Sequence, residues 1–596
     1  MPVIAGITLL TGTVSCRKGL DYDNQNNLNP NNVWKDSTMI GAFLSDIYGN
    51  MMPGWTFNGA DSDEGISNAR SMPDYSRGIL AISTTNSKLD YTNIDKINFF
   101  LDKLQTLSSD ILSDAKKQQF TGEAKFWRAW AYWGMVKNLG GVPLILHTQP
   151  ADNVDALFVP RNKTSECIAQ IVKDLDDAIQ LLPGVYANAG KDYGRITKVA
   201  AMAFKGRVLL SYASPLFNPT GNAARWQAAY DANKAAVDFA VTQGHGLFPS
   251  YRNIWYQERN PEVIMVNQFQ YPNNPTYFNY IRPEPMTKDV SNNNQPLLSL
   301  LLAFPKRDGA PMLLDKARLA DPAYNAEFLT DFYTNRDDRF YATIFCGGTP
   351  YPAPDEVAPI YVKGNSFWNA WKYDVAAGRY VNILNVIHPG MPGNPGLTGF
   401  FDRKGLDTTV TANLGKQAQT DWPEIRFAEV WMNYGECANE LGKTAEALQV
   451  LRNIRQRAGI QPGINNNYGI TAAAVQDIRD AYITERQAEF AFENKRLDDL
   501  RRWKRFDILN NQGARHGLYL TLNNNQTVSP SDNIMTAAVR ARFTANYIDN
   551  LDGDPAFKFN LDLHHWFYAI PPSQISQSKN VLQQNNEWGG AFDPLQ

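Results

Sequence analysis

Cysteines are few in this sequence, and their spacing gives them no shared role. The chain of 596 residues has four, with no CxxC pair and no mixed cluster of cysteine and histidine. If Cys16 is modified, three remain (Cys167, Cys346 and Cys437), and an odd number cannot all pair. The only close histidine pair, His564-His565, is a poor metal site because neighbours on a strand point to opposite faces. The sequence therefore indicates no zinc site, no disulfide framework and no cofactor.

An excess of charge of one sign is also lacking. The formal net charge is −3, which gives no electrostatic reason to expect nucleic acid or another polyanion as a partner. A basic cluster at 495–505 is interleaved with Asp498 and Asp499. We interpret it as a self-neutralising helix face.

Enzyme motifs are missing as well. No GxSxG, HExxH, P-loop or Rossmann pattern occurs. Glu485, Glu489 and Glu493 recur every four residues, and a glycosidase uses two carboxylates. At this spacing along one helical face, however, they can pair with nearby cations. The expected partners are Arg486, Lys495 and Arg496. We favour this structural network over catalysis and expect a protein that is not an enzyme.

The first residues predict where the protein is located. Residues 2–14 are apolar or small, and a run this short cannot span a bilayer, which needs about 20 residues. Residues 1–15 are therefore predicted to be a signal peptide. Thr13-Val14-Ser15-Cys16 resembles a lipobox, in which the cysteine is acylated and anchors the protein to a membrane.

Two features of this segment depart from the usual lipobox. Thr13 stands where Leu, Ile or Val is usual, and no Lys or Arg precedes the apolar run, so the true start can lie further upstream. The alternative is a frayed or cleaved N-terminus with an incidental Cys16. Residues 16–35, rich in Asn and Asp, are expected to form a flexible tether.

Helical periodicity dominates the part of the chain before residue 245. Phe126, Trp130 and Trp133 fall on one face of a predicted helix, which should end at 138–141, where glycine can adopt the left-handed cap. Further helices are predicted at 163–182, 195–213 and 225–243. We expect consecutive helices to pair antiparallel and to stack.

A second helical stretch covers residues 422–510. Residues 423–458 predict a helix–turn–helix in which Gly442 caps the first helix and Thr444 begins the second. The spacing of Tyr434, Gly442 and Leu448 resembles a tetratricopeptide repeat.

Residues 246–421 differ in composition. They are rich in Pro, Asn, Gly and aromatics, with short strand-like runs at 263–266 and 341–345. This composition favours long surface loops, which are often functional. Residues 511–596 are also expected to be mostly loop.

Short motifs occur in a fixed order along nearly the whole mature chain. They lie at 122–129 with 140–145, 296–309, 336–340, 424–429 with 455–459, 485–503, 568–571 and 582–585. The most specific runs from Glu485-Arg486-x-x-Glu489 through Trp503. Together these segments resemble the SusD/RagB family of outer-membrane nutrient-binding lipoproteins.

The resemblance implies a mainly α fold, with a tetratricopeptide-like helical-repeat scaffold and a large loop-rich insertion that carries short strands. The expected units are an N-terminal helical region at 36–245, a ligand-binding insertion at 246–421 and a C-terminal region with a helix pair at 422–596. It also implies a surface-exposed lipoprotein, anchored in the outer membrane through Cys16. Such a protein binds oligosaccharides and delivers them to a SusC-like TonB-dependent transporter. The alternatives are a RagB-like peptide-capturing subunit and a scaffold that binds only proteins.

Aromatic residues in loops are the natural candidates for sugar binding, because sugars present flat apolar faces with a rim of hydroxyls. The predicted ligand-binding residues are Trp55, Tyr75, Tyr277, Tyr280, Trp368 and Trp371. Packing against its own loop is the alternative for each, and Trp371 can face inward from a strand. Family members often carry a Trp shortly before the mid-chain signature, whereas residues 282–286 have none. This difference leaves open where the aromatic platform lies and whether the ligand is starch-like. The tryptophans in helices, including Trp127 and Trp503, are predicted to be core.

Overall fold

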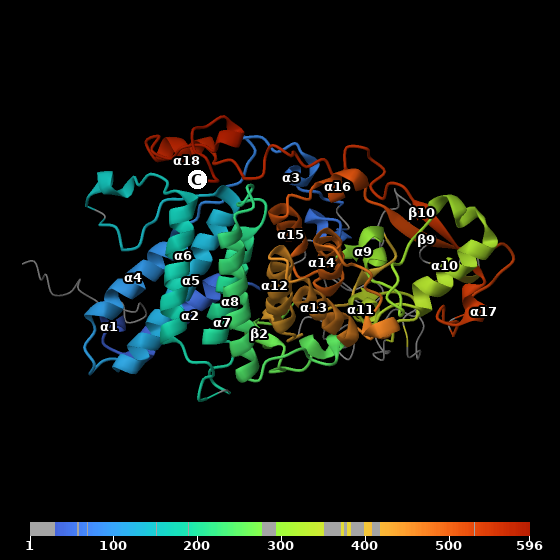
Figure 1. The fold of residues 1–596 in the computed structure, drawn as a ribbon, viewed down its shortest axis with the longest axis horizontal. Helices are drawn as coiled ribbons and strands as arrows, with labels where there is room; N and C mark the ends of the chain where they lie inside the picture. Colours follow the sequence, from blue (N-terminus) through green and yellow to red (C-terminus); the bar gives the residue numbers. More distant parts are fainter. Residues whose placement is uncertain are drawn as a thin grey trace, which may run out of the picture.

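The protein is built around a row of helices, with short strand pairs and loops attached to it (Figure 1). The computed structural model describes residues 30–55, 59–67, 70–150, 152–188, 190–276, 294–350, 367, 371–374, 378–382, 398–407, 418–529 and 531–596. Mainly helical architecture was expected from the sequence, and the structure confirms it.

The N-terminal helices are α1 (Pro30–Val33), α2 (Ser37–Met51), α3 (Asp74–Arg77), α4 (Thr92–Thr106), α5 (Asp114–Leu139), α6 (Thr164–Leu181), α7 (Lys198–Ala213) and α8 (Ala223–Thr242). The long ones pack in chain order, with α5 between α4 and α6 and α7 between α6 and α8. Helix α5 ends where the sequence predicted, because Gly140 has a φ of 77° and would clash with Pro594 if it carried a Cβ. The helices predicted at 163–182, 195–213 and 225–243 are confirmed as α6, α7 and α8.

The C-terminal helices continue the same row. They are α12 (Phe427–Glu440), α13 (Thr444–Arg457), α14 (Val475–Glu489), α15 (Arg496–Arg502) and α16 (Asp507–Gln512). The turn at Gly442 is confirmed, with a φ of 73°. The predicted helical start at Pro423 is wrong, because Trp422–Arg426 forms strand β8. The bonds that β8 makes with a distant strand prevail over the local helical pattern.

Short helices and antiparallel strand pairs make up the rest. The helices are α9 (Leu298–Ala303), α10 (Pro322–Thr334), α11 (Asp338–Thr343), α17 (Ala537–Arg540) and α18 (Pro572–Gln577). The strand pairs are β1 (Gly65–Ile66) with β3 (Gln295–Pro296), β2 (Val263–Asn267) with β8, β4 (Ile344–Phe345) with β7 (Phe401–Asp402), β5 (Trp371–Asp374) with β6 (Arg379–Asn382), and β9 (Gly517–Leu522) with β10 (Phe543–Ile548). The strand expected at 341–345 is mostly α11, since Asp337 caps a helix there by accepting from the amides of Arg339 and Phe340.

The buried core is shared between the regions 36–245 and 422–596, which the sequence predicted as separate units. Helix α8 packs against both α7 and α12, so the two helical regions form one continuous array. The largest buried cluster joins residues of α2 and α4–α7 to residues between 500 and 570. A second cluster joins α9–α11 to the β9–β10 hairpin.

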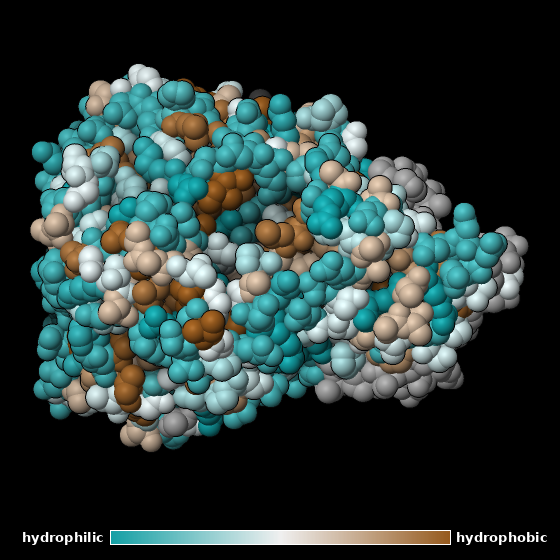
Figure 2. Space-filling view, turned by 45° about the vertical axis from the view of Figure 1, so that its right-hand side comes forward, coloured by the Kyte–Doolittle hydropathy of each residue, from teal (hydrophilic) through white to brown (hydrophobic). Residues whose placement is uncertain are grey.

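The face of the molecule drawn in Figure 2 is mainly hydrophilic. Figure 2 shows apolar residues as scattered patches, some of them gathered at a hollow near the centre of this face. Among the described helices, none is both long and apolar enough to cross a bilayer.

Candidate functional site

The glutamates that resembled a catalytic set lie in a buried ion-pair network. Arg426 contacts the carboxylates of Glu262, Glu489 and Glu493, and Arg457 contacts Glu262 and Glu489. All five side chains are at most 3% exposed. We call this set, with Arg339, Lys404, Arg455 and Glu485, the central network.

The partners predicted for these glutamates were wrong. Helix α14 ends at Glu489, so Glu493 lies beyond it, where Phe492 and Asn494 have positive φ. Arg486 turns to Asp499 at 2.7 Å and Arg496 to Asp63 at 2.9 Å. The structural role itself is supported. Burial disfavours the ionised form of Glu489, but Arg457, Arg426 and Arg339 outweigh it and lower its pKa, whereas a general acid needs a raised one.

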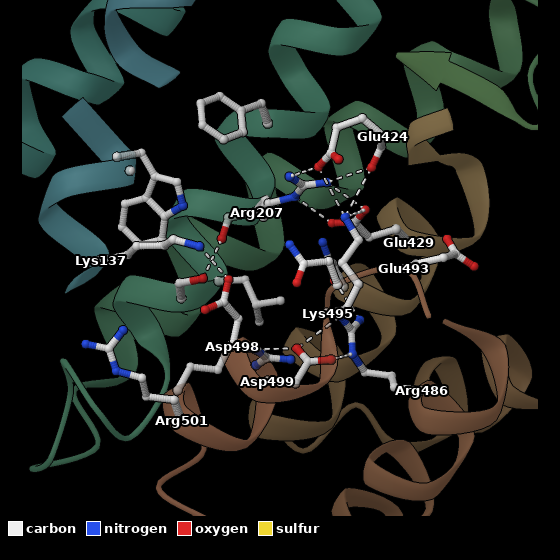
Figure 3. A pocket seen from close by; sticks show the side chains of 18 of the residues that line it. Lys137, Arg207, Glu424, Glu429, Arg486, Glu493, Lys495, Asp498, Asp499 and Arg501 are labelled. Carbon is white, nitrogen blue, oxygen red and sulfur yellow. Dashed lines mark hydrogen bonds and ion pairs between the residues drawn. The ribbon is translucent and has the colours of Figure 1, made fainter. Parts of the chain in front are cut away.

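A charged cavity of about 240 Å³ lies between the N-terminal helices and α15 (Figure 3). Arg207 bridges Glu424 at 2.8 Å and Glu429 at 2.6 Å, and Lys495 contacts the same two carboxylates. Of the other charges labelled there, Lys137 pairs with Asp498 and Arg486 with Asp499, whereas Arg501 donates to the carbonyl of Trp566 at 2.7 Å. Because most of these charges already pair with one another, we interpret them as joining α7 to the C-terminal helices rather than as ligand contacts.

A more open groove of about 360 Å³ has a lining that suits a ligand. The lining residues are Ser45, Tyr48, Gly49, Met52, Tyr193, Gly194, Arg195, Val266, Asn267, Gln268, Phe269 and Asn274. We call it the loop groove. It combines aromatic rings with amides and hydroxyls, and its volume lies within the roughly 300–1,000 Å³ of small-ligand sites.

The helical scaffold fixes the floor of the loop groove. Buried Glu123 of α5 accepts from the hydroxyl of Tyr48 at 2.6 Å and from Arg195 at 2.8 Å. Because one carboxylate holds both side chains, the end of α2 and the 193–195 loop keep a fixed relation.

The rim of the loop groove is made by the turn that follows β2. Asn274 donates to the carbonyl of Gln268 at 3.2 Å, and the side chain of Gln268 donates to the carbonyl of Tyr193. The amide of Phe269 donates to Asp421 at 2.9 Å. Burial raises the pKa of Asp421 to about 6. The turn is thus hydrogen-bonded to the 193–195 loop on one side and to Asp421 on the other.

Trp55 lies beside the loop groove and is packed rather than free. Its indole nitrogen donates to the carbonyl of Thr420 at 2.8 Å, and its ring meets that of Trp422 edge-on at 5.0 Å. Asn267 donates to the carbonyl of Pro53 at 3.0 Å, which joins the Trp55 loop to the groove wall.

Tyr75 has a different environment from the one expected of a sugar platform. It is only 8% exposed, and its ring stacks on Tyr568 at 4.7 Å. Its hydroxyl donates to the carbonyl of His565 at 3.3 Å. With its ring covered in this way, the structure gives Tyr75 a packing role.

Models of known families match both halves of the chain. A model described as "SusD family" matches residues 257–588, which is more than half of the chain. The chain belongs to the SusD family. A second model, described as "Starch-binding associating with outer membrane", matches residues 68–210.

Relatives and solved structures agree with this SusD-family assignment. SusD-like protein P25 of Formosa agariphila is 23% identical over 84% of this chain and 89% of its own length. A solved SusD-like protein of Bacteroides fragilis superposes with a TM-score of 0.70 at 24% identity, covering 94% of this chain and 98% of that one. A laminarin-binding SusD-like protein superposes with a TM-score of 0.56 at 20% identity, covering 92% and 99%. These structures share the fold with our SusD-family protein.

The remaining predicted ligand residues of this SusD-family protein are not placed by the structure. Tyr277, Tyr280 and Trp368 lie outside the described residues. Trp371 begins strand β5, and only its backbone is described. Cys16 also lies outside the described residues.

Sequence reasoning missed most of the loop groove. Gln268, Phe269 and Asn274 belong to the same Asn- and Pro-rich segment as Tyr277, so composition could have included them. Tyr193 and Arg195 lie in a polar turn between two helices, and no local signal distinguishes that turn from other loops.

Proposed function

We propose that the protein is a non-catalytic, cell-surface lipoprotein that binds oligosaccharides in the loop groove and delivers them to a partner TonB-dependent transporter. The observation that carries this proposal is the groove itself, where rings, amides and hydroxyls meet beside Trp55. Ring faces suit the apolar faces of sugars, and the amides suit their hydroxyls.

Membership of the SusD family supports the choice of ligand. One matching family model is named for starch binding at the outer membrane, and one structural neighbour is named for laminarin binding. Tyr277 and Tyr280 follow the groove rim along the chain, and we propose them, with Trp368 and Trp371, as further ligand contacts. An anchor at Cys16 would hold the groove at the cell surface, where a transporter can receive the ligand.

Absence of catalysis is part of the proposal. The glutamates closest to a glycosidase pattern are tied to arginines in the central network, and none of them lines the groove. A bound oligosaccharide should therefore be recovered intact after long incubation.

Calorimetry with two variants of the same turn tests the ligand site. Phe269→Ala removes a ring that lines the groove, whereas Tyr271→Ala removes a ring that is 46% exposed and lies outside the lining. Against a panel of plant, host and microbial oligosaccharides, Phe269→Ala should weaken binding about tenfold and Tyr271→Ala should not. Equal effects, or binding of mixed peptides alone, would refute the proposed site or ligand.

Delivery is tested in cells. Cys16→Ala should move the protein out of the outer-membrane fraction and reduce uptake of the ligand. Unchanged uptake would contradict the importer role, even where calorimetry confirms binding.

A further inference from the structure

The β9–β10 hairpin, α10 and α17 lie together at one end of the molecule (Figure 1). Residues of these elements line a second groove. Its volume of about 910 Å³ lies in the upper part of the range for ligand sites. We call it the hairpin groove. It shares no lining residue with the loop groove.

The hairpin supplies a polar wall with ordered side chains. Asn546 pairs with Tyr519 across the two strands. Asn546 donates to the hydroxyl of Thr521 at 2.9 Å, and Thr544 donates to Asn523 at 2.7 Å. Tyr519, Asn523, Thr544 and Asn546 all line the groove. Rings, amides and hydroxyls held on a paired strand surface suit the hydroxyl groups of a saccharide.

The charge of the hairpin groove has one sign. Of the described residues that line it, only Lys316 and Arg540 are charged, and no carboxylate is among them. Lys316 is well exposed, and its contact with Asp549 is long, at 3.8 Å. An anionic group is therefore the expected complement.

Arg540 lines the groove without a carboxylate partner among the described residues. The residue is 7% exposed. Its Nη1 donates to the carbonyls of Ile534 at 3.2 Å and Met535 at 2.5 Å. Its Nε is buried without a partner. No carboxylate of a described residue pairs with it, in contrast to Arg426 and Arg457 of the central network.

The guanidinium of Arg540 suggests which anion fits. A guanidinium can bind a carboxylate with two parallel N–H bonds, which an ammonium group cannot do. Arg336 is also buried with unpaired nitrogens, but it packs against the ring of Phe340 and lines neither groove. The groove is what makes Arg540 a candidate ligand contact.

We propose that the hairpin groove is a second saccharide site, specific for oligosaccharides that carry carboxylates, such as those built from uronic acids. Arg540 binds the carboxylate, Lys316 adds positive charge at the rim, and the hairpin wall binds the hydroxyls. The site is independent of the loop groove.

Titration calorimetry with a short oligogalacturonate, its methyl ester and a simple tricarboxylate tests this proposal on the purified full chain. The acid form should bind at least about tenfold more tightly than the neutral ester, because charge-assisted hydrogen bonds are lost in the ester. Arg540→Met should remove this preference. Phe269→Ala, in the loop groove, should leave it intact.

Control variants separate binding from folding. Arg542→Gln removes the same charge two residues away, from an arginine that pairs with Asp532 at 2.8 Å and does not line the groove. It should bind like the wild type. Lys316→Gln changes an exposed side chain and should weaken the acid form about threefold without altering the melting temperature.

Three results would overturn the proposal. These are an acid form that binds no better than its ester, equal binding of the tricarboxylate, and an acid preference that persists in folded Arg540→Met. The proposed function would fail separately, through loss of neutral-saccharide binding at the loop groove.

Discussion

The central network and the loop groove use similar polar groups in opposite ways. In the network, Arg426 and Glu489 are at most 1% exposed and satisfy each other. In the groove, Asn267 and Phe269 are half-buried, and Gln268 is exposed. Buried charges fix the packing of distant segments, whereas half-buried amides and rings keep surface available to a ligand. The comparison predicts that substitutions in the network change stability and that substitutions in the groove change binding.

Breaking the network should have the largest effect. Glu489→Gln removes one of the two carboxylates that Arg426 and Arg457 both contact, and leaves them only Glu262 in common. We expect a loss of about 3–5 kcal/mol in the free energy of unfolding, because uncompensated buried charge is costly. Urea denaturation followed by tryptophan fluorescence measures it, with Glu327→Gln, an exposed position on α10, as the control. A loss no greater than that of the control would contradict the structural role of the network.

Glu64, a buried acid outside the central network, should make the stability of the protein fall as pH rises. Burial, reinforced by neighbouring Asp63, raises the pKa of Glu64 to about 8. Because the folded-state pKa exceeds the ordinary value of 4.5, the stability that Glu64 contributes is present at low pH. It is lost as pH rises through about 8.

Glu64→Gln removes this titration and keeps an acceptor for the amide of Phe492. At pH 9 the variant should be more stable than the wild type by on the order of 1–3 kcal/mol, and at pH 4 the two should be nearly equal. Urea midpoints across this range give the measurement. The residual slope of the variant belongs partly to Asp402, whose pKa burial raises to about 7. A variant that is not more stable at high pH would show that Glu64 titrates normally.

Loosening the groove should change binding more than stability. Asn267→Ala removes the bond to the carbonyl of Pro53 that joins the Trp55 loop to the groove wall. We expect a stability loss of only about 1 kcal/mol, faster amide exchange in residues 52–55 and weaker oligosaccharide binding. Hydrogen exchange and calorimetry together check it. A large stability loss with unchanged affinity would contradict the difference that we expect between the central network and the loop groove.

The smallest effect is expected from an exposed ion pair. Lys96 contacts Asp46 at 2.6 Å, but the aspartate is 57% exposed. Lys96→Ala should cost about 0–1 kcal/mol, since water and salt screen such pairs. Thermal melting at low and high salt measures this cost. A cost near that of Glu489→Gln would mean that burial does not determine how much an ion pair contributes to stability.

The helices were the most predictable part of the fold. The apolar spacing in α5, α12 and α13 and the glycines at 140 and 442, which end α5 and α12, are signals within a few residues of the chain. Local sequence is therefore enough to predict these helices. Strand β8 could not be predicted in this way, because its partner β2 lies about 160 positions earlier. The β9–β10 hairpin was missed in a region whose composition suggested loop.

The candidate site was less predictable than the fold. Trp55 was chosen for its loop position, and it lies beside the groove, but Thr420 and Trp422 hold it there. Tyr75 had the same local signal and is buried, because Tyr568 reaches it from almost 500 positions away. The loop groove joins three separate segments, and only the tertiary fold determines that they meet.

The packing of α8 against α12 has a consequence for the synthesis of the chain. Trp226 and Ala229 of α8 lie in one buried cluster with residues of α12 and α13, and Tyr230 donates to Glu446 at 2.8 Å across 216 positions. The apolar face of α8 therefore leaves the ribosome long before its cover exists. The last third of the chain completes the row, so the nascent protein has to be kept from self-association until α12 and α13 have been made.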